Sequence, residues 1–111
     1  MPEKVRKALL DRILYGDPID SFDAAKSLEE ARDRLAVPAL IDFLEDEDDS
    51  VRFWSAKALG EIGDRRAVGP LVRTLEDPAD LVPGAAAKAL GKIGDPRAEK
   101  GLIKQPVDFF S

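Results

Sequence analysis

The side chains of this sequence that could carry chemistry include a run of five acids, residues 45–49. Carboxylate oxygens are the ligands that hard divalent cations prefer. The spacing is not that of an EF-hand loop, because a loop starting at Asp46 needs glycine sixth and glutamate twelfth, and neither is present. We therefore expect Asp48 or Asp49 to cap the helix that follows, with the other acids complementing the positive end of that helix.

Arg65 and Arg66 could contact phosphate, but two arginines in a chain of net charge −5 are typical of a solvated helix start. The chain has no cysteine and no histidine, which excludes Cys/His zinc sites, thiol redox pairs, Ser-His-Asp triads and Cys-His dyads. We therefore predict a protein that is not an enzyme and has no cofactor and no metal. The acidic balance also argues against a nucleic-acid partner.

The length of 111 residues is sufficient for about one domain. Hydrophobic residues make up 44% of the sequence and charged residues 35%, as in a folded, soluble protein. No stretch approaches the ~20 apolar residues of a membrane-spanning helix, and residues 1–6 lack the apolar core of a secretory signal. We therefore expect a cytoplasmic protein without membrane contact.

An internal repeat predicts the elements that position these side chains. The segment AKALGEIGDRRA, residues 56–67, returns as AKALGKIGDPRA, residues 87–98, at an offset of 31 and with ten of twelve positions identical. A weaker copy, AKSLEEARDRLA, occupies residues 25–36, and ALLDRIL, residues 8–14, aligns with the second half of a unit. The single domain, residues 1–111, is therefore divided into a half repeat and three repeats at residues 1–16, 17–46, 47–77 and 78–111, the last with an atypical C-terminal cap.

Each repeat has the apolar spacing of two helices. In the second full repeat, apolar residues recur at helical spacing from Val51 to Ile62 and again from Val68 to Leu75. Gly63 and the aspartate after it suit the end of one helix and the cap of the next. No segment alternates with period two, so no sheet is expected. The seven predicted helices span residues 3–15, 18–31, 34–45, 49–62, 65–76, 80–93 and 96–104.

A helix pair as short as one repeat cannot bury its apolar face alone, whereas stacked pairs form a continuous core. We therefore predict an all-α fold, a right-handed α-solenoid of about three and a half repeats. The segments VRFWSAKALGEIGDRRAVGPLVRTLED, residues 51–77, and LVPGAAAKALGKIGDPRAEKGLIK, residues 81–104, closely resemble the HEAT-like repeats first recognised in phycobilisome lyase subunits. The resemblance covers nearly the whole chain.

The glycines of this repeat pattern suit close packing and tight turns. Gly60 and Gly91 permit close backbone approach near the end of the first helix. The first full repeat has Glu29 and Arg32 in place of two of the glycines, so its first helix is expected to be longer or its turn to differ in shape. Asp80 is expected to cap the helix at the start of the third repeat, with a proline in the first turn.

The resemblance implies that the second helices of the repeats line a concave surface where proteins bind. The exposed positions of those helices recur once in every repeat and form two ladders of candidate partner-binding residues. The first ladder is Asp11, Asp42, Arg73 and Lys104, and the second is Arg12, Phe43, Thr74 and Gln105. The first ladder runs from acidic to basic, which could orient an elongated partner. Phe43 is expected either to anchor an interface or to pack as part of the core.

Four further aromatic residues have two interpretations each. We expect Trp54 to pack across the seam to a neighbouring repeat while Phe53 covers the outer surface; the alternative is a partner site on the convex side. Phe109 and Phe110 follow Pro106, which stops the last helix early, and we expect them to fold back as a cap on the core. Alternatively they dock into another subunit or a client.

The main functional hypothesis is a non-catalytic protein-interaction module, an adaptor, scaffold or assembly factor that binds a protein of unknown identity on its concave face. The resemblance implies one alternative, a lyase or lyase subunit acting on a tetrapyrrole chromophore. A helical-repeat nucleic-acid binder is the other, but it needs a basic groove, with which Asp11 and Asp42 conflict. An end face of so short a solenoid could also pair two copies of the chain.

Overall fold

The computed structural model describes residues 1–94, and among them it forms helices and no strand. The α-helices are α1 (Glu3–Tyr15), α2 (Pro18–Ala31), α3 (Val37–Phe43), α4 (Asp49–Ile62), α5 (Val68–Thr74) and α6 (Val82–Ile93). Two 3-10 turns, η1 (Arg34–Ala36) and η2 (Arg65–Ala67), lead directly into α3 and α5. The predicted helix at residues 96–104, the candidates Lys104 and Gln105, and the pair Phe109 and Phe110 lie outside the described residues.

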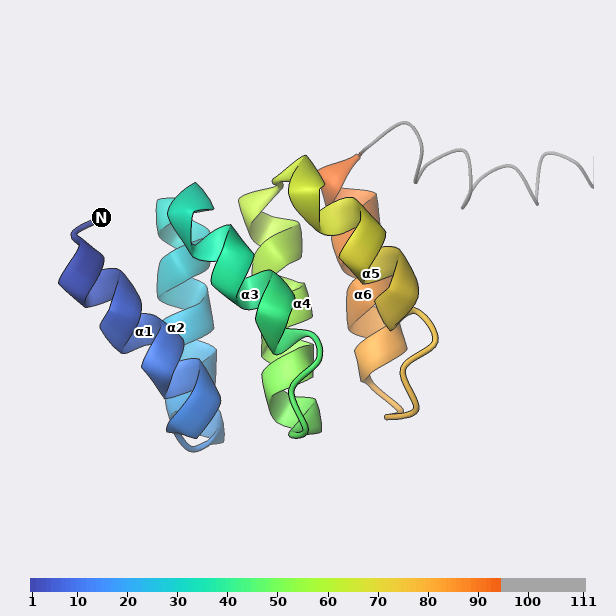
Figure 1. Cartoon of the computed structure of the whole chain (residues 1–111), viewed down its shortest axis with the longest axis horizontal. Coiled ribbons are helices and arrows are strands. Elements are labelled where there is room, and N and C mark those ends of the chain that lie inside the picture. Colours follow the sequence, from blue (N-terminus) through green and yellow to red (C-terminus); the bar gives the residue numbers. More distant parts are fainter. Residues whose placement is uncertain (95–111) are drawn as a thin grey trace, which may run out of the picture.

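The helices are stacked in two layers, which confirms the predicted α-solenoid. The first helices of the repeats, α2, α4 and α6, stand side by side in one layer (Figure 1). The second helices, α1, α3 and α5, cross in front of them in the other layer. Each layer presents an apolar side to the other, and the core lies between them. Leu28, Leu59 and Leu90 occupy the same position in three successive repeats and are buried there.

The second helices are shorter than predicted, whereas α1, α2 and α4 have the predicted bounds. The spans expected at residues 34–45 and 65–76 begin with a 3-10 turn, and their α-helical parts end at Phe43 and Thr74. The backbone N–H of Leu44 then donates to a carbonyl three residues back instead of four. The chain tightens into 3-10 geometry at both ends of these helices, which is a common way for a helix to end.

Aspartate caps start four of the helical segments, α2, η1, α4 and η2. The Asp48 carboxylate accepts a hydrogen bond from the backbone N–H of Ser50 at 2.8 Å, so of the two predicted caps Asp48 is the one observed. The predicted cap at Asp80 is wrong, because α6 begins two residues later and has no side-chain cap. Pro83 lacks an N–H and can stand only in the first turn of a helix, and it does so when the helix begins at Val82.

The turn after each first helix has the same left-handed backbone in all three repeats. Gly63 and Gly94 have φ angles of 78° and 67°, and Arg32, at the equivalent position, has a φ of 47°. α2 is as long as α4, at 14 residues each. The first repeat therefore keeps both the helix length and the turn, and neither of the departures expected there is observed.

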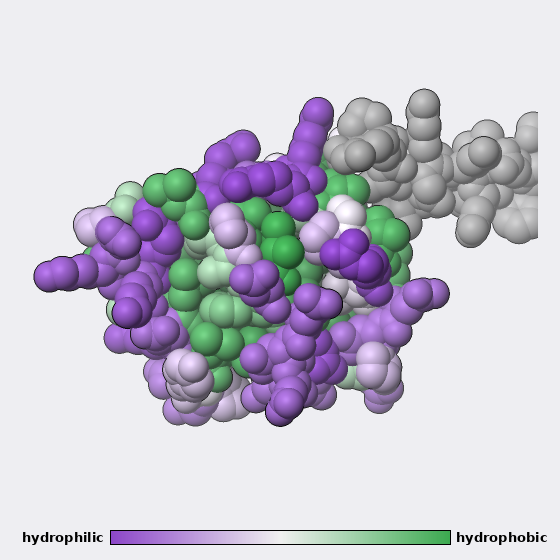
Figure 2. Space-filling model, in the orientation of Figure 1, coloured by the Kyte–Doolittle hydropathy of each residue, from purple (hydrophilic) through white to green (hydrophobic). Residues whose placement is uncertain are grey.

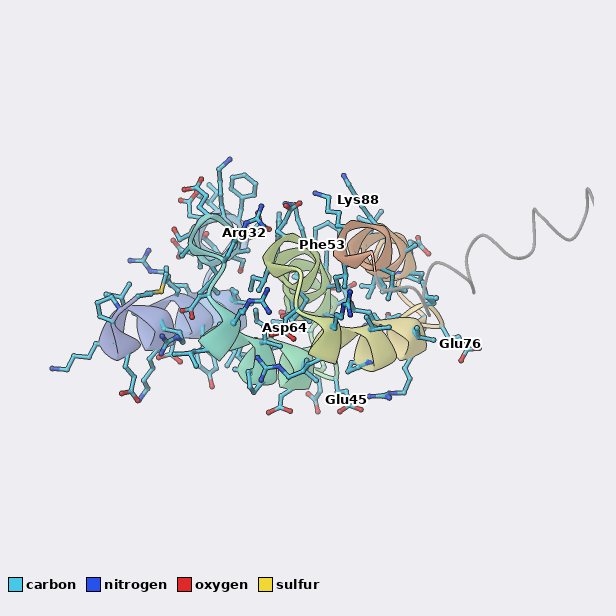
Figure 3. The ribbon with its side chains drawn as sticks, turned by 90° about the horizontal axis from the view of Figure 1, so that it is seen from above. Arg32, Glu45, Phe53, Asp64, Glu76 and Lys88 are labelled. Carbon is cyan, nitrogen blue, oxygen red and sulfur yellow. The ribbon has the colours of Figure 1, made fainter. Side chains whose placement is uncertain are left out.

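The helices are more closely spaced in one layer than in the other. α4 packs extensively against α2 and α6, whereas α1, α3 and α5 make few contacts with one another. Seen from above, α4 is set back between α2 and α6, toward the other layer (Figure 3). The helices on the inside of a curved stack are the closer together, so α2, α4 and α6 form the inner row.

This curvature corrects one expectation, that the second helices line the concave surface. The first helices come close because they meet through small residues such as Gly60 and Ala89, and the distance between packed helices depends on the side chains at the contact. We call the exposed side of α2, α4 and α6 the concave face. The exposed side of α1, α3 and α5 is the convex face.

Candidate functional site

Within residues 1–94, the predicted ladder positions belong to α1 and α3 and to the end of α5, the helices of the convex face. Asp11, Arg12, Asp42 and Arg73 are exposed there, as their helical register predicts. Thr74 is not: it is 7% exposed, and its Oγ1 donates to the carbonyl of Pro70 at 2.8 Å. The prediction that Thr74 faces a partner is therefore wrong, because its hydroxyl turns back onto its own helix.

Phe43 also belongs more to the interior than to the surface. Its ring is half-buried and packs against the hydrophobic core. Of the two roles expected for Phe43, core packing is the one observed. The ladders therefore contribute charge and not an aromatic anchor to the convex face.

The convex face has a shallow groove of about 200 Å³ between α3 and α5. Ile41, Leu44 and Pro70 provide its apolar lining, and Arg73 is its cation. Acidic side chains also line it, so its charges are mixed. Figure 2 shows apolar surface in the middle of this face, bordered by hydrophilic side chains.

An ion pair joins α4 to the loop that follows α5, within one repeat. The Arg52 guanidinium donates twice to Asp77, with Nε 2.7 Å from Oδ2 and Nη2 3.2 Å from Oδ1. It also donates to the backbone carbonyls of Asp46 and Glu47, which fixes the acidic loop between two repeats. Burial raises the pKa of Asp77, but hydrogen bonds from Arg52 and the backbone of Ala79, with the charge of Arg52, lower that pKa by more.

Asp64 is the centre of a second ion pair. Arg66, one of the two arginines expected at a solvated helix start, is exposed and donates to Asp64, with Nη2 2.8 Å from Oδ2. The hydrogen bond from Arg66 holds the pKa of Asp64 below its usual value, against the effect of burial. Arg34, from the preceding repeat, adds its charge at 3.7 Å. These ion pairs give Arg52 and Arg66 a structural role.

The concave face has an aromatic cluster at the seam between α2 and α4. The ring of Trp54 meets the ring of Phe22 edge-on across the seam, with 5.5 Å between centroids, and meets Phe53 on its own helix at 4.9 Å. The Lys26 ammonium lies 5.8 Å from the centre of the Phe22 ring. The prediction that Trp54 packs across the seam to a neighbouring repeat is confirmed.

A groove of about 290 Å³ follows on the same face, between α4 and α6. Its apolar walls are Phe53 and Leu81, and its floor consists of small residues of α6, among them Ala85. Phe53 and Lys88 both lie on the concave side of the helices (Figure 3). Phe53 was expected to cover the outer surface; instead it is half-buried and forms one wall of this groove.

Lysines surround the groove in an otherwise acidic chain. Lys57, Lys88 and Lys92 line it, together with a single carboxylate, Glu61. Lys57 pairs with Glu29 of α2 at 3.2 Å, and Lys92 pairs with Glu61. Among residues 1–94 no ion pair includes Lys88. The sequence reasoning missed this group, although its signal was available: Lys26, Lys57 and Lys88 recur at the repeat offset of 31.

Two other kinds of site are not found in residues 1–94. That part of the chain has no group of three or more His, Cys, Asp or Glu side chains that could hold a metal ion. It also has no helix that is long and apolar enough to cross a membrane.

Comparison with known protein families identifies the type of repeat. A family model for HEAT repeats matches the chain twice, over residues 7–83 and residues 38–105. No curated protein matches it. The matched model describes HEAT repeats in general and does not single out the phycobilisome-lyase type. The two matches together cover most of the sequence, and with the stacked helix pairs described above they show that the chain belongs to the HEAT repeat family.

Proposed function

We propose that this protein is a non-catalytic protein-interaction module, an adaptor, scaffold or assembly factor, that binds its partner on the concave face. HEAT repeats commonly serve as protein-interaction modules. The predicted ladders lie on the convex face. The proposal therefore keeps a concave binding surface but assigns it to residues of α2, α4 and α6.

The observation that supports this proposal is the exposed aromatic and aliphatic surface beside the groove. Phe22 is 42% exposed although its ring takes part in the aromatic cluster, and Leu81, at the groove wall, is 72% exposed. Aromatic side chains at the centre of a face are the residues that most often dominate binding energy. The convex groove is smaller, is lined by more acidic than basic side chains and has no aromatic lining.

Affinity capture from the source organism's lysate, followed by mass spectrometry, tests the proposal when run with one variant of each face. Phe22→Ser alters the concave face, and Arg73→Glu alters the convex ladder. We expect a partner that the wild type and Arg73→Glu retain and that Phe22→Ser loses, with unchanged helicity by circular dichroism.

Two results would contradict the proposal. Loss of the partner in Arg73→Glu alone would move the site to the convex ladder. Equal retention by both variants would exclude both sites.

A further inference from the structure

The two seams on the concave face have the same register but are filled differently. Between α2 and α4, the ring of Phe22 meets the indole of Trp54. The repeat offset of 31 converts this pair into Phe53 and Ala85 at the seam between α4 and α6. The phenylalanine is retained, whereas a methyl group replaces the indole. The space that Trp54 fills at the first seam is therefore open at the second, and both Phe53 and Ala85 line the groove found there.

The shape of the groove suits one large apolar side chain. Gly84, Ala85 and Ala89 make a floor without bulky groups, and Phe53 and Leu81 stand beside it. Its volume of about 290 Å³ lies just below the range for small-molecule pockets, about 300–1,000 Å³. An aromatic or long aliphatic side chain of a longer ligand would bury apolar surface against Phe53, in the way that Trp54 packs against Phe22 at the neighbouring seam.

The charge around the groove indicates which charge the rest of the ligand carries. Three lysines and one glutamate line it, although acids outnumber bases in the whole chain by 22 to 17. Even with Glu29 counted against Lys57, positive charge remains among the side chains that line the groove. By contrast, Asp49 and Asp80 line the adjoining hollow beyond Phe53 and Leu81. Lys88 has no carboxylate partner in the described part of the chain. Complementary charge at the edge of an interface favours association with the oppositely charged partner.

We infer that this groove binds an acidic segment of a partner protein, taking up one large apolar side chain of that segment while Lys88 and its neighbours contact the carboxylates. The inference rests on the function proposed above and specifies the partner's chemistry. It is independent of which protein carries the segment.

The probe is a random 12-residue peptide library displayed on phage and selected against the full chain. The expected peptides are rich in Asp and Glu and contain a Trp, Phe or Leu. Their affinity for purified variants is then measured by fluorescence anisotropy with labelled synthetic peptides, at low and at high salt. We expect weaker binding at high salt, because salt screens charges that are exposed to solvent.

Two matched pairs of variants locate the binding. Ala85→Trp places in the second seam the indole that the first seam already accommodates, and we expect it to weaken binding more than about tenfold by occupying the groove. Its control is Val72→Trp, a tryptophan at an exposed position of the convex face. Lys88→Glu is expected to weaken binding about tenfold, and Arg73→Glu, the same charge change on the convex face, to leave it unchanged.

Circular dichroism checks that Ala85→Trp is folded. If it is not, Lys88→Glu carries the test, because the side chain of Lys88 is exposed and its replacement leaves the core intact.

The outcomes separate this inference from the proposed function. Selected peptides that are basic, or that bind Ala85→Trp as well as the wild type, overturn the inference. If Phe22→Ser nevertheless abolishes their binding, the concave face binds proteins without this groove, and the proposed function stands. Peptides lost only in Arg73→Glu overturn both, and a library that yields no binder overturns the inference while lysate capture still decides the function.

Discussion

Gly60 of α4 lies so close to Ala89 of α6 that it leaves no room for a side chain of its own. A Cβ added to Gly60 would lie 2.5 Å from the Cα of Ala89 and 2.7 Å from its Cβ. Neither of those atoms can swing away as the end of a flexible side chain would. The spacing of α4 and α6, and with it the width of the concave groove, therefore depends on the missing methyl group at residue 60.

The first prediction concerns this contact. Gly60→Ala should lower the free energy of unfolding by about 1–3 kcal/mol, as overpacking of a core usually does, although alanine is the better helix former by about 1 kcal/mol. Gly69→Ala is the control, since a Cβ there meets nothing within 4 Å, and it should be neutral or stabilising. Urea unfolding followed by circular dichroism measures both. A Gly60→Ala protein as stable as the wild type would contradict the packing argument.

The second prediction concerns the turn after α2. Arg32 has a φ of 47°, in the left-handed region that disfavours residues with a Cβ, and the two later repeats have glycine there. Arg32→Gly should raise the free energy of unfolding by about 1 kcal/mol. Gly63→Ala, the opposite change one repeat later, should lower it by a similar amount. If both changes destabilise the protein, Arg32 contributes contacts that outweigh its backbone strain.

The third prediction concerns a buried hydroxyl. Ser55 is 0% exposed, and its Oγ has no hydrogen-bond partner among residues 1–94. The third repeat has Ala86 at the same position, so the site accommodates alanine. Ser55→Ala should raise stability by about 1 kcal/mol, because an unsatisfied buried hydroxyl costs about 1–3 kcal/mol. A thermal melt should then shift upward by about 4–8 °C, and a downward shift would indicate that the hydroxyl is satisfied in solution.

The fourth prediction concerns acid. In the folded protein the pKa of Asp77 lies below its ordinary value of 3.8, whereas in the unfolded chain that pKa is ordinary. The ion pair with Arg52 therefore contributes its full stability above about pH 5, and that contribution is lost as the pH falls below 3.8 through the folded pKa. Unfolding free energies measured from pH 7 to pH 3 should show this decline.

Asp77→Asn tests the origin of this pH dependence. The variant should be less stable at pH 7, and its stability should fall less between pH 5 and pH 3 than that of the wild type. Asp11→Asn is the control, because Asp11 is exposed and has no ion pair within residues 1–94. An identical acid profile in Asp77→Asn and the wild type would assign the decline to other carboxylates.

Much of the fold could be predicted because the same local sequence pattern occurs in several repeats. Apolar spacing and the glycine–aspartate pairs located α1, α2 and α4 to the residue. The cap at Asp80 failed because residues 80 and 81 form a turn and α6 begins only at Val82. Arg32 shows that a position can keep its backbone conformation after losing the glycine that normally marks it.

The candidate site was less predictable, because curvature depends on contacts across seams. Which layer is concave is decided by pairs such as Gly60 and Ala89, which belong to different repeats, and their contact is not visible in the spacing of either helix alone. The groove also depends on a difference between repeats. Comparison of Trp54 with Ala85 in the aligned copies could have indicated it from the sequence.

The place of α4 in the stack has a consequence for how the protein loses its structure. α4 packs against α2, α6 and α3, while α2 and α6 stand on opposite sides of it. In such a nearest-neighbour array, opening can begin at an end and leave the rest of the stack packed, but the loss of α4 removes the contacts on both of its sides at once. Amide hydrogens should therefore exchange most slowly in α4, and a partner seated between α4 and α6 would extend that protection toward the C-terminal side.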